Sequence, residues 1–115
     1  MLSENHIYDQ RQYRTMLQKI NSYFMNKIDA NAVIIDIDNL LHFLHVKNED
    51  FFSKCKDLLM DIDVGIYYLN EGHLGDEQLM KLDIERINKS MKSMQQLIES
   101  KIDKNLTDED VEYKY

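Results

Sequence analysis

The stretch DEQLMKLDIERINKSMKSMQQLIESKID, residues 76–103, decides the fold class of this chain. Its apolar residues recur at steps of three and four, the spacing that gathers side chains on one face of an α-helix. This seam consists of Met80, Ile84, Ile87, Met91, Met94, Ile98 and Ile102. Asp76 is a favourable N-cap residue, and Glu77 places an acid in the first turn, where the helix dipole favours negative charge. The stretch predicts one long helix that begins after Asp76 and runs to about Asp103.

Three segments upstream repeat the helical spacing. We expect a first helix from about Asp9 to Lys27. Asp29 or Asn31 can cap a second helix, and Asn48 can cap a third. The predicted buried residues are Tyr13, Leu17, Ile20, Phe24 and Ile28 in the first helix, Val33, Ile34, Ile37, Leu40, Leu41 and Leu44 in the second, and Phe51 or Phe52, Cys55, Leu58, Leu59 and Ile62 in the third.

The chain offers few places at which these helices can break. It has no proline, and its three glycines all fall between residues 65 and 75. Gly65 weakens the continuation of the third helix, and Gly72 and Gly75 mark a turn. Four amphipathic helices with short connections bury their apolar faces most simply as an antiparallel bundle. We therefore predict an all-α protein, an antiparallel four- to five-helix bundle in which residues 1–115 form one domain, with a flexible acidic tail from about residue 104.

Composition narrows the possible partners and compartments. The formal net charge is −7, whereas nucleic acids and anionic membranes attract clustered Lys and Arg. No apolar run approaches the roughly 20 residues of a transmembrane helix, and the N-terminus lacks the apolar core of a signal peptide. The single cysteine, Cys55, cannot form an internal disulfide, which agrees with a reducing compartment. We expect a cytoplasmic protein that binds neither nucleic acid nor membrane directly.

The negative charge is concentrated in the middle of the chain. Between Asp57 and Glu85 eight acidic residues meet one base, Lys81. The eight are Asp57, Asp61, Asp63, Glu71, Asp76, Glu77, Asp83 and Glu85. A field of one sign on a small domain attracts a basic partner by electrostatic steering, although a solvated face that keeps the protein soluble has the same composition.

One motif suggests an enzyme. AVIIDIDNLL, residues 32–41, resembles the first motif of haloacid dehalogenase-type phosphatases, in which Asp36 would be the nucleophile and Asp38 the acid. That family has Gly-Thr-like residues where Asn39 and Leu40 stand here, and its parallel sheet cannot be built from helical flanks. We predict instead a helix with Asp36 and Asp38 exposed, and a protein that is not an enzyme and has no catalytic residues.

No metal site or cofactor is predicted. Asp38, His42 and His45 share a helical face, but no fourth ligand accompanies them, and boundary histidines with hydrogen-bond partners fit the pattern better. DIDVG, residues 61–65, begins like a calcium loop, yet Gly72 stands where the loop requires a carboxylate. Cys55 has the spacing of a small buried hydrophobe.

Two stretches of the chain resemble the colicin D type immunity proteins. INSYFMNKIDANAV, residues 20–33, resembles the opening of that family, where an apolar helix ends in an Ile-x-Ala-like turn, and Ile28 and Ala30 hold that place. KDLLMDIDVGIYYLNEGHLGDEQLMK, residues 56–81, is similar to the family's third helix, acidic loop and capped last helix. The matching residues are Leu59, Asp61, Asp63, Tyr67, Gly75, Asp76, Glu77 and Leu79.

The resemblance covers roughly Leu17 to Leu97, with gaps. The chain departs from the family in its N-terminal extension, in its acidic tail and at Val33, where an aromatic is more typical. The resemblance implies a helical immunity protein that neutralises a toxin made by its own cell, often a tRNA-cleaving nuclease delivered by a colicin or by a contact-dependent inhibition system.

The charge pattern agrees with that implication. A nuclease holds phosphates with basic residues, so an inhibitor can cover that surface with carboxylates. Tyr67 and Tyr68 lie within the acidic window and have the aromatic character of interface anchors, and we expect one of them to be buried in the core. The predicted residues that bind a basic toxin domain are Asp57, Asp61, Asp63, Tyr67, Tyr68, Glu71, Asp76 and Glu77.

Two alternatives stay open. One is a small acidic regulator, such as a phage-type inhibitor or adaptor of another basic protein. The other is the phosphatase-like enzyme that uses Asp36, which a strand at residues 33–37 would favour. A neighbouring reading frame for a large secreted toxin would favour an immunity protein over the regulator.

Overall fold

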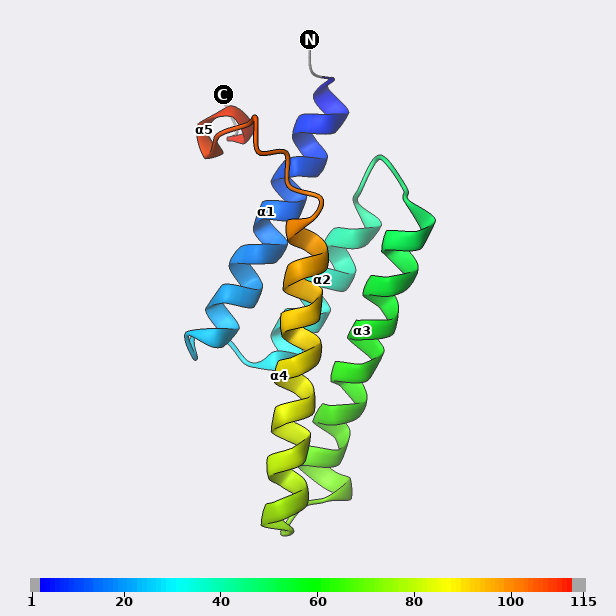
Figure 1. Ribbon diagram of the computed structural model, residues 1–115, viewed down its shortest axis with the longest axis vertical. Helices are drawn as coiled ribbons and strands as arrows, with labels where there is room; N and C mark the ends of the chain where they lie inside the picture. The colour runs from blue at the N-terminus through cyan, green and yellow to red at the C-terminus, as the bar shows by residue number, and fades with distance from the viewer. Residues whose placement is uncertain (1–2, 113–115) are drawn as a thin grey trace.

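The computed structural model describes residues 3–112 and consists of helices joined by short turns (Figure 1). The elements are α1 (Glu4–Phe24), α2 (Ala30–His42), α3 (Glu49–Tyr67), the π-helical turn η1 (Tyr68–Gly72), α4 (Glu77–Glu99) and α5 (Asp108–Val111). The four long helices run alternately up and down, and each packs against the next, with α4 returning to α1. The predicted all-α antiparallel bundle is confirmed, and no strand occurs in residues 3–112.

As predicted, a side-chain cap begins each of the helices α2, α3 and α4. The Asp29 carboxylate accepts a hydrogen bond from the Ala32 N–H at 2.8 Å and begins α2. Asn48 does the same for α3, and Asp76 for α4. Each cap satisfies an amide that the first turn of a helix leaves without an intrahelical partner. Asp29 rather than Asn31 is therefore the cap of α2.

Three helix boundaries differ from those expected. α1 begins at Glu4 instead of near Asp9, because the Ser3 hydroxyl caps it by accepting from the His6 N–H at 3.1 Å. It ends at Phe24, where Asn26 turns the chain with a φ of 60°, a left-handed conformation that Asn tolerates. α4 ends at Glu99, earlier than the predicted Asp103.

The core lies between the four long helices and follows the predicted faces. Its buried members are Tyr13, Met16, Ile20, Val33, Ile37, Leu41, Leu44, Phe51, Cys55, Leu59, Ile62, Ile87, Met91, Met94 and Ile98. Of the two adjacent phenylalanines, Phe51 is buried and packs edge to face on Tyr13, with ring centroids 5.5 Å apart. The helical spacing therefore identified most of the core, but the prediction that Phe24 is buried is wrong, because this residue is 37% exposed at the end of α1.

The core does not extend along the whole molecule. α2 has 13 residues, whereas α3 has 19 and continues into the five residues of η1. The lower part of the α3–α4 hairpin consequently projects beyond the ends of α1 and α2, and the molecule measures 55 × 28 × 21 Å (Figure 1). The prediction that Met80 and Ile84 belong to a continuous buried seam is wrong, because no third helix reaches them: Ile84 is 46% exposed.

Gly65 does not weaken α3 as expected. The helix continues through it to Tyr67, and Gly65 is buried against α4. A Cβ added at Gly65 would lie 2.7 Å from Cγ1 of Ile87, closer than real side chains approach. The missing side chain therefore lets α3 and α4 pack closely at the point where the hairpin leaves the bundle.

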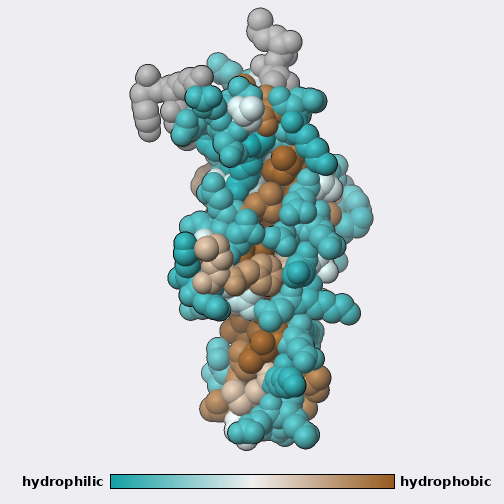
Figure 2. Space-filling view, turned by 60° about the vertical axis from the view of Figure 1, so that its left-hand side comes forward, coloured by the Kyte–Doolittle hydropathy of each residue, from teal (hydrophilic) through white to brown (hydrophobic). Residues whose placement is uncertain are grey.

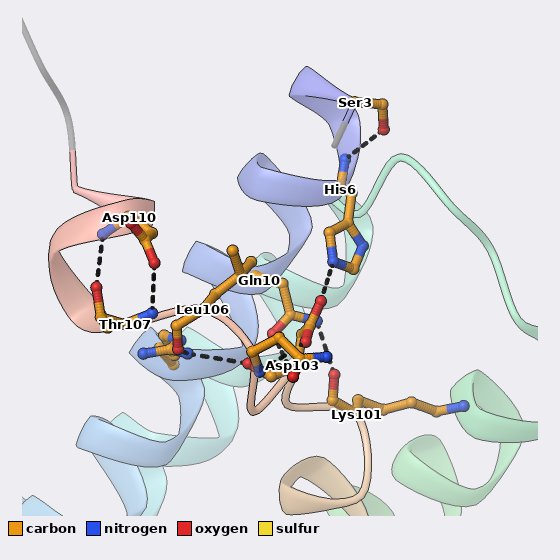
Figure 3. Close-up of polar contacts among 10 residues, drawn as sticks. Ser3, His6, Gln10, Lys101, Asp103, Leu106, Thr107 and Asp110 are labelled. Carbon is orange, nitrogen blue, oxygen red and sulfur yellow. Dashed lines mark hydrogen bonds and ion pairs between the residues drawn. The ribbon is translucent and has the colours of Figure 1, made fainter. Parts of the chain in front are cut away.

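The tail after α4 packs on α1 and is not a loose extension. We expected flexibility from about residue 104, but residues 104–112 pass over α1 and end in α5 (Figure 3). Leu106 and Val111 are buried, and Thr107 and Asp110 form a reciprocal capping box at the start of α5. Two apolar residues in an otherwise polar segment are too few to show a helical period. The sequence pattern therefore did not predict that this segment packs on α1.

Polar side chains of α1 hold the tail in place. The Gln10 amide donates to the Lys101 carbonyl and accepts from the Asp103 N–H, both at 2.7 Å (Figure 3). Nε2 of His6 lies 2.8 Å from a carboxylate oxygen of Asp103, and Arg14 donates to the Leu106 carbonyl at 2.8 Å. The hydrogen bond from His6, with one from the backbone of residue 105, lowers the pKa of Asp103 from its ordinary value of 3.8.

No helix within residues 3–112 combines the length and the apolarity needed to cross a membrane.

Adding a methyl group at Gly65 should destabilise the bundle. Gly65→Ala gains about 1 kcal/mol of helix propensity, but overpacking against Ile87 costs about 1–3 kcal/mol, so we expect a net loss of about 1 kcal/mol in the free energy of unfolding. In an Ile87→Ala background the clash is removed, and the same change should be neutral or stabilising. Urea denaturation of the four proteins measures this coupling; equal effects in both backgrounds would contradict the close approach.

The Asp103 contact predicts a pH dependence of stability. Because the pKa of Asp103 is lower in the folded state, its carboxylate stabilises the fold above the ordinary value of 3.8, and this contribution is lost as the pH falls through the folded-state pKa. The difference in unfolding free energy between the parent and Asp103→Asn should therefore narrow below about pH 4. Asp50→Asn, at an exposed helical ion pair, is the matched control and should show a flatter difference.

Candidate functional site

The candidate functional site is the projecting end of the α3–α4 hairpin. We call residues 61–77 the hairpin tip; they comprise the last turns of α3, η1, the connecting turn and the first residue of α4. The tip lies at the bottom of the molecule in Figure 1, away from both chain termini. The predicted binding residues that it brings together are Asp61, Asp63, Tyr67, Tyr68, Glu71, Asp76 and Glu77, and all of them are exposed.

Asp57 does not belong to the hairpin tip. It is exposed on α3, but it precedes Tyr67 by ten residues, which corresponds to about 15 Å along the helix axis. It borders a separate depression of about 330 Å³ between α3 and α4, together with Lys54 and Ser93. Asp57 therefore lies far from the tyrosines of the tip, although it is only one helical turn from Asp61 on α3.

The carboxylates of the hairpin tip fall into two groups. Asp61 pairs with Arg86 at 3.3 Å, and Asp76 caps α4. Asp63, Glu71 and Glu77 form no hydrogen bond or ion pair through their side chains within the described part of the chain. These three carboxylates are the ones most available to a partner, because binding would break no contact inside the protein.

Both tyrosines of the tip are exposed, which corrects the expectation that one is buried. Tyr67 is 55% and Tyr68 is 37% exposed. Their rings meet edge to face with centroids 5.4 Å apart. The reason is the projection of the hairpin: beyond the ends of α1 and α2 there is no core on which a second aromatic ring could pack.

A small polar cluster fixes the position of Tyr68. Its ring stacks on the imidazole of His73 at a centroid distance of 4.6 Å and an interplanar angle of 17°. Nδ1 of His73 lies 2.8 Å from the Asp83 carboxylate, which is buried on α4. A carboxylate accepts only, so Nδ1 carries the proton. Asp83, counted in the acidic window, therefore serves as an internal hydrogen-bond acceptor and not as a surface charge.

The wide turn of η1 brings Gly72 against Tyr68. A Cβ at Gly72 would lie 2.6 Å from Cδ1 of the Tyr68 ring, so only glycine fits this contact without a shift. π-Helical turns inside or at the end of α-helices are rare and are frequent at functional sites. Sequence patterns located the turn but did not indicate its π-helical form or the role of His73.

An apolar groove lies beside the hairpin, between the projecting part of α3 and α4 and the turn that joins α1 to α2. Its volume is about 680 Å³, and its apolar walls include Phe24, Ile28, Ile66, Leu69 and Ile84. Apolar atoms continue along this side of the molecule below the bundle core (Figure 2). The sequence could not indicate this groove, because its residues share the spacing of core residues and only the length of α2 exposes them.

The residues of the enzyme and metal hypotheses lie apart from the tip, in and after α2. Residues 33–37 are helical, so the strand that a phosphatase motif requires does not form. Asp36 pairs with Lys19 at 3.2 Å, and Asp38 pairs with Lys56. His42 contacts the Asp38 carbonyl through Nδ1. No group of three or more metal-ligating side chains gathers within residues 3–112.

Cys55 is buried in the core, as its spacing predicts. Burial raises the pKa of its thiol to about 12, and the nearby charge of Lys101 only partly opposes this shift. A thiol with so high a pKa is not a nucleophile at neutral pH. Cys55 therefore acts as a packing residue.

Comparisons with known proteins give no relative. No family model matches the chain, and neither the curated proteins nor the solved structures contain a significant match.

Removing the His73 side chain should weaken the fold of the tip. His73→Ala leaves the buried Asp83 carboxylate without its donor, and an unsatisfied buried acceptor costs about 1–3 kcal/mol. His42→Ala, at an exposed histidine of α2, should cost about 0.5 kcal/mol or less. Denaturant unfolding of both variants tests this, and equal losses would show that the His73–Asp83 contact contributes nothing specific.

Proposed function

We propose that this chain is an immunity protein, which binds a cognate bacterial toxin domain in the cytoplasm and neutralises it by covering a basic surface. The observation that carries the proposal is the projecting hairpin tip, which brings the exposed carboxylates of Asp63, Glu71 and Glu77 and the exposed ring of Tyr67 together within residues 61–77. A surface that combines free charge with an aromatic anchor at the end of a rigid element suits protein binding.

The negative charge of the tip favours a positively charged partner. Seven of the eight carboxylates between Asp57 and Glu85 are exposed, Asp83 being the exception, and the only base among them is Lys81. Such a field speeds the diffusional encounter with a positively charged surface and discourages acidic partners. The shape supports the same role, because a projecting hairpin can enter a concave site that a flat surface cannot reach.

A nuclease domain is the partner that this chemistry fits best. Its active site must hold phosphates with cationic side chains, and carboxylates can occupy the positions of those phosphates. The resemblance of residues 20–33 and 56–81 to colicin D type immunity proteins supports a tRNA-cleaving nuclease in particular. Tyr67 would then anchor the complex, since tyrosine combines an apolar ring with a polar end.

The test compares two triple variants that carry the same change of charge. Asp63→Lys, Glu71→Lys and Glu77→Lys together reverse the unpaired carboxylates of the tip. Glu4→Lys, Glu49→Lys and Glu99→Lys reverse exposed carboxylates elsewhere and form the control. Glu77 in the tip set and Glu49 in the control set each lie in the first turn of a long helix, where reversal loses a favourable helix-dipole interaction. Glu4 also lies in a first turn, so the control set loses one more such interaction.

Each protein is used to capture partners from its native host, and the association rate of the captured protein is measured at several salt concentrations. The tip variant should associate about tenfold more slowly or worse and lose most of its salt dependence, whereas the control should keep the parent's dependence. Tyr67→Ala should weaken the complex by about 2 kcal/mol or more without changing the free energy of unfolding.

The captured protein, expressed alone, should stop bacterial growth, and co-expression of the chain should restore growth. A captured protein that is harmless alone, or that binds both triple variants equally, would contradict the proposal.

A further inference from the structure

The apolar groove beside the hairpin has the dimensions of a helix-binding site. At a rise of 1.5 Å per residue, the 13 residues of α2 span about 20 Å, while the 19 residues of α3 with the five of η1 span about 36 Å. About 16 Å of the hairpin, or three helical turns, therefore has no helix lying against it. The groove opens at the upper end of this uncovered length, next to the end of α1.

The uncovered face is apolar along its centre. Ile66 on α3 and Leu69 in η1 face the groove together with Ile84 on α4. Met80 lies one helical turn below Ile84. Figure 2 shows apolar atoms in the lower half of the molecule with hydrophilic atoms on both sides. Exposed apolar area that is contiguous and bordered by polar groups is typical of a binding surface.

Polar groups at the borders are positioned to receive backbone or side-chain partners. The Tyr23 hydroxyl donates to the Asn88 side chain at 2.5 Å, and both residues line the groove. Asn31 and Asn70, which also line the groove, make no side-chain hydrogen bond within residues 3–112. A ligand that lies in the groove can therefore form hydrogen bonds at both borders without displacing an internal one.

Charge distinguishes the possible occupants. Lys27 and Asp29 line the upper end, where Lys92 also lies over the Phe24 ring at 5.9 Å from its centroid. Towards the tip, helical spacing places Asp63 one turn from Ile66, and Glu77 two turns from Ile84, with only Lys81 as a base. The surface between the groove and the tip is therefore acidic, although neither carboxylate lines the groove itself. A second copy of this chain would bring another acidic hairpin against it, whereas a basic helix would complement it.

We infer that the groove binds an amphipathic helix of the partner, about three turns long, whose apolar face lies on Ile66, Leu69 and Ile84 and whose basic residues lie towards the hairpin tip. This inference rests on the proposed function, because it names the part of a basic partner that the hairpin contacts. It corresponds to the helix-in-groove mode of recognition, in which apolar residues at i, i+3, i+4 and i+7 are the anchors.

The test uses designed peptides, so it does not require the natural partner. An amphipathic peptide of about 14 residues carries leucines at i, i+3, i+4 and i+7 with flanking lysines; a second has glutamates in place of the lysines, and a third has the lysine peptide's composition in scrambled order. Each is added to isotope-labelled protein, and the amide shifts locate its binding site. Ile84→Ser removes one wall of the groove, and Ile35→Ser removes an isoleucine of similar exposure on the outer face of α2, 52% against 46%.

The lysine peptide should shift amides around Ile66, Leu69 and Ile84, and the other two peptides should not. Ile84→Ser should weaken its binding about tenfold or more, and Ile35→Ser by less than about twofold. Shifts confined to the carboxylates of the tip would overturn the groove site while leaving the electrostatic surface of the proposed function intact. Equal binding of the glutamate peptide, no binding of any peptide, or groove shifts that depend on protein concentration alone would also overturn it, the last by indicating a second copy. A failure of the partner-capture experiment would leave the peptide result unchanged, so the two proposals fail separately.

Discussion

The α3–α4 hairpin is longer than α2, and this difference in length determines where the core ends and which side chains stay exposed. A helix of 13 residues cannot cover partners of 19 and 23 residues, so the bundle has four helices in cross-section near α1 and only two at the tip. The close approach of Gly65 to Ile87 lies where this change occurs. The hairpin must therefore hold itself together through helix-to-helix packing and the His73–Asp83 contact, without a surrounding core.

The two ends of the molecule differ in how much of their helix surface is covered by other parts of the chain. At the end that holds the termini, the tail covers α1, and Gln10 and Arg14 bind its backbone. At the other end the side chains of Ile84 and Tyr67 stay exposed, beside carboxylates that have no internal partner. Exposed apolar groups and like charges both reduce stability or solubility, so their concentration at one end favours a binding role for that end. The same features carry both the proposed function and the proposed groove.

Sequence patterns predicted the elements of this fold well, because helix formation depends on local spacing and caps. Asp29, Asn48 and Asp76 cap helices as expected, and the faces that contain Ile37, Cys55 and Met91 are buried. Patterns failed where the outcome depended on distant residues. The tail was expected to be flexible because Leu106 and Val111 are too few to show a period, and the residues that hold it lie about 90 positions away in α1.

Side-chain spacing alone predicts that the chain forms helices and where most of them begin, and counting charges locates the negative charge in the middle of the chain. Which of those residues face solvent depends on how the helices pack. Ile84 has the same spacing as buried Ile87, and Asp83 belongs to the same acidic run as exposed Glu77, yet their environments are opposite. Burial depends on whether another helix reaches a given turn of the hairpin. The start of α2 at Ala30, more than 50 residues before Ile84 in the sequence, sets that limit.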